Sequence, residues 1–241
     1  MLTQAIHWFQ IGSTVVETLL LFRILTLKLH RTYAFITLYW AVNVIFDIAT
    51  SVFGWQFGWE GPESRQLSVY QVPLFAVLFP LAAWDAFEEV RPQILKLRRL
   101  HATRLMSGLF ITAILACICS FGLQDQDSQG ISTFASIGLF LWLGSASASL
   151  LFVWNLLRTV KSQGVIVPRN TSVWSIYFII AFGLAITNVA VAIAGQTLGA
   201  VAVDVLDAIL LPFDIGLAIW CFFKLKAVPS DVTSEPEKAR L

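Results

Sequence analysis

The stretch DVLDAILLPFDIGLAIWCFF, residues 204–223, sets the architecture expected of this chain. It is almost entirely apolar, and about 20 apolar residues in a helix are enough to cross the hydrocarbon core of a bilayer. It contains three aspartates but no lysine, arginine or histidine. The stretch therefore predicts a membrane-spanning helix, and it raises the question of why such a helix keeps three acids.

Apolar stretches of this length recur along the 241 residues. The chain is 57% hydrophobic and 13% charged, whereas soluble domains carry about 25% charged residues. A soluble helical bundle would show polar stripes, and LFITAILACICSFGL at 109–123 has none. We predict an all-α membrane protein with seven spans, at approximately 7–27, 33–54, 68–87, 105–123, 133–156, 173–195 and 201–223.

The basic residues predict the orientation of these spans. The first, third and fifth loops and the C-terminal tail hold two, five, three and four Lys or Arg residues, which is 14 of the 16 in the chain. By the positive-inside rule the N-terminus lies outside and the C-terminus in the cytoplasm, and we expect a bacterial inner membrane, that is, a plasma membrane. Tryptophans near the predicted boundaries are typical of aromatic belts: Trp8, Trp55 and Trp59 on the outer side, Trp84, Trp154 and Trp174 on the inner side.

Two segments at this cytoplasmic side differ from the spans. Residues 1–227 are expected to form one seven-helix bundle, and 228–241, which are polar and rich in charge, a disordered tail. The stretch DAFEEVRPQILKLRRL at 85–100 continues the third span with basic residues. It is expected either to lie along the inner membrane surface, against anionic headgroups, or to be a solvated loop.

Ionisable and amide side chains lie inside the predicted spans, where each acid costs a few kcal/mol. They are Glu17, Asn43, Asp47, Asn188, Asp204, Asp207 and Asp214. At about 1.5 Å per residue, Glu17 and Asn43 fall near the midplane, and Asp47, Asn188 and Asp207 roughly 5–8 Å toward the outside. We predict that these residues line a polar cavity between the first, second, sixth and seventh spans. No basic residue lies at this depth, so the acids are expected to be neutral or to hold a cation or a proton-bearing ligand.

Helix breakers and small residues predict how the spans pack. Pro73, Pro80 and Pro212 are expected to kink the third and seventh spans. Because proline has no N–H, Pro212 leaves the Ala208 carbonyl without its helical partner. The small residues of GSASAS, 144–149, predict close contact with a neighbouring helix.

Several classes of function are excluded by composition. A net charge of +1 gives no electrostatic footprint for nucleic acid. A retinal pigment needs a lysine within the last span, and this span has none. No spacing typical of a metal site, phosphate loop or nucleophile–base pair occurs, so we expect no metal and no cofactor.

Two resemblances bear on function. LLLFRILTLKLHRTYAFITLYW, residues 19–40, resembles bacterial seven-span membrane proteins, a likeness that implies no activity. YAFITLYWAVNVIFD, residues 33–47, with Asn43, Phe46 and Asp47, resembles the membrane-bound terpene cyclases of meroterpenoid pathways. That family has Trp and Glu where this chain has Phe46 and Asp47. The resemblance implies that Asp47 and Asp214 would protonate an epoxide or alkene.

Three functions fit these observations. The first is a sensor or small-ligand-binding protein with an acidic intramembrane cavity, whose partners are the lipid bilayer and a small-molecule or cation ligand. The second is a proton- or cation-coupled transporter. The third is an intramembrane terpene cyclase, so whether the chain is an enzyme stays open at this point.

Overall fold

A computed structural model describes residues 2–58, 62–94, 99, 102–109, 111, 130–198 and 200–228. Within these residues the regular structure is helical, and no strand occurs. The all-α prediction is therefore confirmed. The helices are α1 (Leu2–Thr26), α2 (Ala34–Phe57), α3 (Pro62–Asp85), α5 (Gly130–Ser162), α6 (Arg169–Leu198) and α7 (Ala200–Lys224), with short 3-10 helices η1 (Leu29–Arg31) and η2 (Glu88–Val90). Residues 102–109 are also helical.

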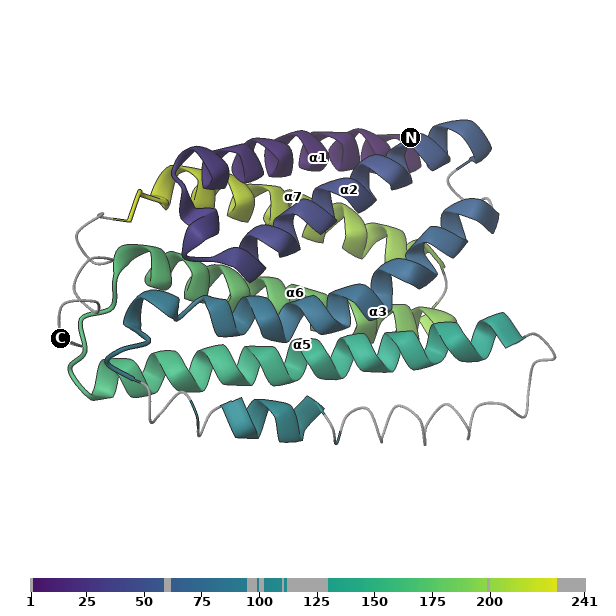
Figure 1. The fold of residues 1–241 in the computed structure, drawn as a ribbon. Helices are drawn as coiled ribbons and strands as arrows, with labels where there is room; N and C mark the ends of the chain where they lie inside the picture. The colour runs from purple at the N-terminus through teal and green to yellow at the C-terminus, as the bar shows by residue number, and fades with distance from the viewer. Residues whose placement is uncertain are drawn as a thin grey trace.

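The long helices lie side by side and close into a ring. Each packs on two neighbours, in the order α1, α2, α3, α5, α6, α7 and back to α1. α1, α3, α5 and α7 all finish at one end of the bundle, on the left of Figure 1, where η1 and η2 also lie. We call this the basic end, because the Lys- and Arg-rich loops follow these helices.

Four described segments are long and apolar enough to cross a bilayer, namely Trp8–Thr26, Ala34–Phe57, Phe140–Ser162 and Arg169–Thr187. They agree with the first, second, fifth and sixth predicted spans. Large apolar side chains point away from the bundle, with Phe22 64% and Ile45 63% exposed. Soluble monomers rarely expose contiguous apolar patches of this kind, whereas lipid solvates them. The helices are therefore those of a membrane protein.

The remaining predicted segments are the third, fourth and seventh spans and the C-terminal tail. α3 covers most of the third span and α7 covers the seventh. Most of the fourth span, 105–123, and the tail from 229 onward lie outside the described residues. α3 begins six residues earlier than predicted because Pro62 opens it, and proline is favoured in the first helical turn.

α5 runs past its predicted end at residue 156 and stops at Ser162. Lys161 in its last turn interacts favourably with the carbonyl end of the helix. Gly164 then adopts a positive φ of 70°, and the Val165 N–H bonds back to the Val160 carbonyl. A left-handed glycine that closes the last turn is a common helix stop.

Asp85, the last residue of α3, caps the start of α2. Its buried carboxylate accepts hydrogen bonds from the backbone N–H groups of Phe35 at 2.8 Å and Ile36 at 3.1 Å. The first N–H groups of a helix have no partner within the helix, so this bond satisfies two of them. After Asp85 the chain turns into the bundle and buries Phe87, Val90 and Ile94. Apolar side chains thus anchor the start of the predicted extension, while Arg91, Pro92 and Gln93 are exposed. Whether the extension lies along the headgroups or is a solvated loop stays a prediction.

The N-terminus of α6 is bonded to the end of α7. The Asn170 side chain accepts a hydrogen bond from the Lys226 N–H at 3.0 Å and donates to its carbonyl at 2.8 Å. It also donates to Glu89 at 3.2 Å, and Arg169 donates to the Lys224 carbonyl at 2.8 Å. These bonds join η2, α6 and α7 at the basic end.

Aromatic rings fill the centre of the ring of helices. Phe79 lies between Trp142 and Phe182, with centroid distances of 5.5 and 5.2 Å in edge-to-face geometry. Trp174, which we predicted for an aromatic belt, is fully buried. It packs edge-on against Tyr33 at 6.3 Å, because its position on α6 faces the interior rather than the lipid.

Candidate functional site

Glu17 lies near the middle of α1 and is almost fully buried, with 3% of its surface exposed. Both of its carboxyl oxygens have partners. The hydroxyl of Ser13, one turn earlier, donates to Oε1 at 3.0 Å. The side-chain amide of Asn43, on α2, donates to Oε2 at 2.5 Å. These bonds hold the acid between α1 and α2, as the burial of a polar group requires.

Asp47 adds a second carboxyl group to this position. It follows Asn43 by one turn of α2 and therefore shares its face. Its carboxyl group lies close enough to that of Glu17 for the two groups to interact. Two neighbouring carboxylates repel each other when both are ionised, and a proton or a cation at the pair removes that repulsion.

Asp214 brings a third carboxyl group from α7, which packs on α1. It is partly buried and lies close enough to Glu17 and Asp47 for their charges to interact. We refer to Glu17, Asp47 and Asp214 as the acid cluster. The first, second and last helices of the ring each contribute one member, although almost 200 residues separate the first acid from the last in the sequence.

Two tyrosines that the sequence analysis did not single out lie beside the acid cluster. The hydroxyls of Tyr39 on α2 and Tyr177 on α6 are 3.5 Å apart and buried. Both interact electrostatically with Asp214. One signal could have found the first of them, because Tyr39, Asn43 and Asp47 recur every fourth residue and so form a stripe along one face of α2.

The acid cluster has no basic partner among the described residues. The guanidinium of Arg23, six residues after Glu17, lies 5.3 Å from the centre of the Phe222 ring on α7. The ion pair found in the described part of the chain, Arg91–Glu88, is at the basic end. Within the same residues, no three His, Cys, Asp or Glu side chains are grouped as a metal site.

Three predicted cavity residues are not described at the level of side chains. The side chains of Asn188, Asp204 and Asp207 lie outside the described part of the structure, although their backbones belong to α6 and α7. The predicted layer of Asp47, Asn188 and Asp207 stays a prediction. Among the remaining candidates, the fold brings together Glu17, Asn43, Asp47 and Asp214.

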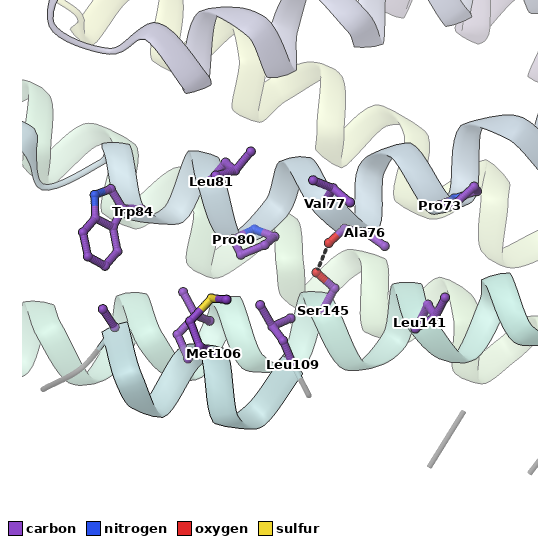
Figure 2. A pocket seen from close by; sticks show the side chains of 12 residues that line it. Pro73, Ala76, Val77, Pro80, Leu81, Trp84, Met106, Leu109, Leu141 and Ser145 are labelled. Carbon is purple, nitrogen blue, oxygen red and sulfur yellow. Dashed lines mark hydrogen bonds between the residues drawn. The ribbon is translucent and has the colours of Figure 1, made fainter. Parts of the chain in front are cut away.

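A separate apolar cavity of about 500 Å³ lies between α3, α5 and the helical residues 102–109. Figure 2 shows Pro73 and Leu141 at one end and Trp84 and Met106 at the other. Ser145 is the one hydroxyl-bearing residue of the lining, and it donates a hydrogen bond to the Ala76 carbonyl. The acid cluster belongs to α1, α2 and α7, so the two features occupy different parts of the ring.

Comparison of the chain with models of protein families, with curated proteins and with solved structures finds no match. The function must therefore be argued from the site.

Proposed function

We propose that this protein is an integral membrane sensor or small-ligand-binding protein whose acid cluster takes up a proton or a small organic cation. The observation that carries this proposal is the meeting of Glu17, Asp47 and Asp214 from three helices. An acid near the bilayer centre costs about 3 kcal/mol, so three cost about 9 kcal/mol. Hydrogen bonds between membrane helices return only about 0.6 kcal/mol each on average. Packing alone does not account for three acids, whereas a charged or proton-bearing ligand does.

We also propose a full topology for the chain. It has seven spans and lies in the inner membrane of a bacterial cell, with the N-terminus outside and the C-terminus in the cytoplasm. In support, α1, α3, α5 and α7 finish at one end of the bundle (Figure 1), and 14 of the 16 basic residues lie in the segments that follow the first, third, fifth and seventh spans. The same reasoning makes the opposite end external. A reporter fused after Leu241 should read cytoplasmic, and one inserted at Gln124 external.

A second candidate, an intramembrane terpene cyclase, is favoured by the interaction of Asp47 with Asp214. These are the two acids to which the family resemblance assigns proton donation. Tyr39, beside them, makes edge-to-face contacts with Phe75 and Phe178 at 5.5 and 5.9 Å. Aromatic faces attract cations, as a carbocation intermediate would require. A protonated Asp47 or Asp214 would act as the general acid.

A third candidate, a proton- or cation-coupled transporter, is favoured by the proximity of the Glu17 and Asp47 carboxyl groups, a pair that would hold a proton between them. Transport requires that this proton leave and return during each cycle. A binding protein does not need this repeated release and uptake of a proton, and a cyclase needs it of only one acid.

Amide substitutions separate these candidates. In lipid nanodiscs, the unaltered protein should bind tetramethylammonium, a small organic cation, and the Glu17→Gln, Asp47→Asn, Asp214→Asn triple variant should not. Glu88→Gln at the basic end serves as the control and should bind normally. Full binding by the triple variant would reject the proposed function.

The same variants test the alternatives. In proteoliposomes that contain a pH-sensitive dye, proton flux that Asp214→Asn abolishes without unfolding the protein would identify a transporter. Conversion of a polyprenyl epoxide to a cyclic product, lost in Asp47→Asn while binding is retained, would identify a cyclase. Neither result would be expected of a sensor.

A further inference from the structure

The apolar cavity between α3, α5 and residues 102–109 has the chemistry of a site for an alkyl chain. Its volume, about 500 Å³, is within the range typical of ligand pockets, about 300–1,000 Å³. Among the described residues, its lining is made of proline and aliphatic side chains, Met106 and Trp84, with Ser145 as the only hydroxyl. It is open toward the lipid, because Val77 and Met106 of the lining are 58% and 65% exposed.

The hydroxyl of Ser145 is already engaged. Pro80 has no N–H, so the carbonyl of Ala76, four residues earlier on α3, lacks its helical partner. Ser145 donates its hydrogen bond to this carbonyl from α5, as Figure 2 shows. The bond satisfies the exposed backbone group and removes the hydroxyl from the cavity's chemistry. A ligand here would therefore be held through apolar contact.

The length of the cavity fits one leaflet of a bilayer. From Pro73 to Trp84 the cavity follows eleven residues of α3, which is about 16 Å of helix. Half the hydrocarbon core of a bilayer is about 15 Å. A single acyl chain that enters near Trp84 would thus reach the region of Pro73 at the bilayer centre.

The Trp84 end of the cavity lies at the basic end of the bundle. Ala102 lines the cavity there, and Arg99, three residues before it in the chain, is exposed. Anionic headgroups attract basic residues at the membrane surface, strengthening binding about fivefold for each residue. Uncharged or zwitterionic lipids gain no such attraction.

From the apolar lining, the length and the basic end we infer that this cavity binds one acyl chain of an anionic phospholipid, whose headgroup lies against Arg99. The inference does not depend on the acid cluster or on its proposed ligand. It gives the protein a dedicated lipid site on the opposite side of the ring from the acids.

Labelling with a photoactivatable lipid tests the inference on the full chain. The protein would be reconstituted in phosphatidylcholine vesicles containing a small fraction of phosphatidylglycerol with a diazirine in its acyl chain, and the adducts would be mapped by mass spectrometry. We expect adducts concentrated on Val77, Met106 and Leu109. The same diazirine chain on phosphatidylcholine should label these residues about fivefold less, as the loss of attraction to one arginine predicts.

Variants with matched controls sharpen the test. Val77→Trp fills the mouth of the cavity and should abolish labelling at Met106, whereas Val15→Trp, at a similarly exposed valine on α1, should not change it. Arg99→Gln should reduce labelling about fivefold. Arg104→Gln should have little effect, because Arg104 is two residues past Ala102 and so lies on the far side of the helix. Loss of two charges from the first loop, in Lys28→Gln, Arg31→Gln, should have no effect.

Two outcomes would overturn the inference. Equal labelling by phosphatidylglycerol and phosphatidylcholine would mean that the site does not select an anionic headgroup. Labelling of the cavity no stronger than that of Leu151, which is 60% exposed on α5, would mean ordinary contact with surrounding lipid. Both comparisons use the unaltered protein, so they hold even if a variant fails to fold.

Discussion

Removal of the Ser145 hydroxyl should destabilise the bundle only because Pro80 is present. In the natural chain, Ser145→Ala leaves the Ala76 carbonyl without a donor. An unsatisfied buried polar group costs about 1–3 kcal/mol, and measured hydrogen bonds between membrane helices reach at most about 1.7 kcal/mol. We therefore expect Ser145→Ala to lower the free energy of unfolding by roughly 1–1.5 kcal/mol.

Pro80→Ala changes this result. It returns an N–H to position 80, which can donate to the Ala76 carbonyl within α3. With that carbonyl satisfied, Ser145→Ala should cost close to nothing. The coupling between the two sites should therefore be about 1 kcal/mol, which exceeds the roughly 0.3–0.5 kcal/mol within which independent sites add.

The measurement is a double-mutant cycle on unfolding by sodium dodecyl sulfate in mixed micelles, followed by circular dichroism. Ser149→Ala is the matched control, one turn further along α5. The Ser149 hydroxyl is buried without a hydrogen-bond partner in the described residues, so its removal should be neutral or stabilising in both backgrounds. An equal cost of Ser145→Ala with and without Pro80 would refute the reasoning.

Three further substitutions test other parts of the fold. Asn170→Ala removes both bonds to the backbone of Lys226, so the Lys226 amide should exchange its hydrogen faster and stability should fall by about 2 kcal/mol. Asp85→Ala removes the cap of α2 and should cost about 1 kcal/mol, with faster exchange of the first-turn amides of α2. Trp174→Ala should cost about 3–5 kcal/mol because the ring is fully buried. The same change at Trp154, which is 54% exposed, should cost far less in the same unfolding assay.

The helical class and most element positions could be predicted because the apolar stretches are long and lack polar stripes. Helix ends were less predictable, since they depend on single residues such as Pro62 and Gly164. The cap that Asp85 provides for α2 was not predictable. It joins residues about 50 positions apart, and a lone aspartate at the end of an apolar stretch carries no sign of its partner.

The candidate site was predictable in composition but not in detail. Unusual acids in apolar helices pointed to Glu17, Asp47 and Asp214. Tyr177 was missed because a tyrosine in a membrane helix is ordinary. Its approach to Tyr39 depends on how α2 and α6 face each other inside the ring. The role of Trp174 was mistaken for the same reason, because depth in the membrane can be counted along a helix, but the face turned to the core depends on its neighbours.

The acid cluster lies where the ring of helices closes, so the ligand binding proposed for it would act on that closure. α1 and α7 are the first and last long helices, and their contact closes the ring. Two pairs lie along this seam. The guanidinium of Arg23 on α1 lies over the ring of Phe222 on α7, and this cation–π contact holds the two helices together. Glu17 and Asp214, by contrast, repel each other when both are ionised. A proton or cation at the cluster removes that repulsion, so binding there should strengthen the packing of α1 on α7. The proposed sensor function needs such a link between an occupied site and a change in helix packing, and the contact between α1 and α7 is where that proposal locates it.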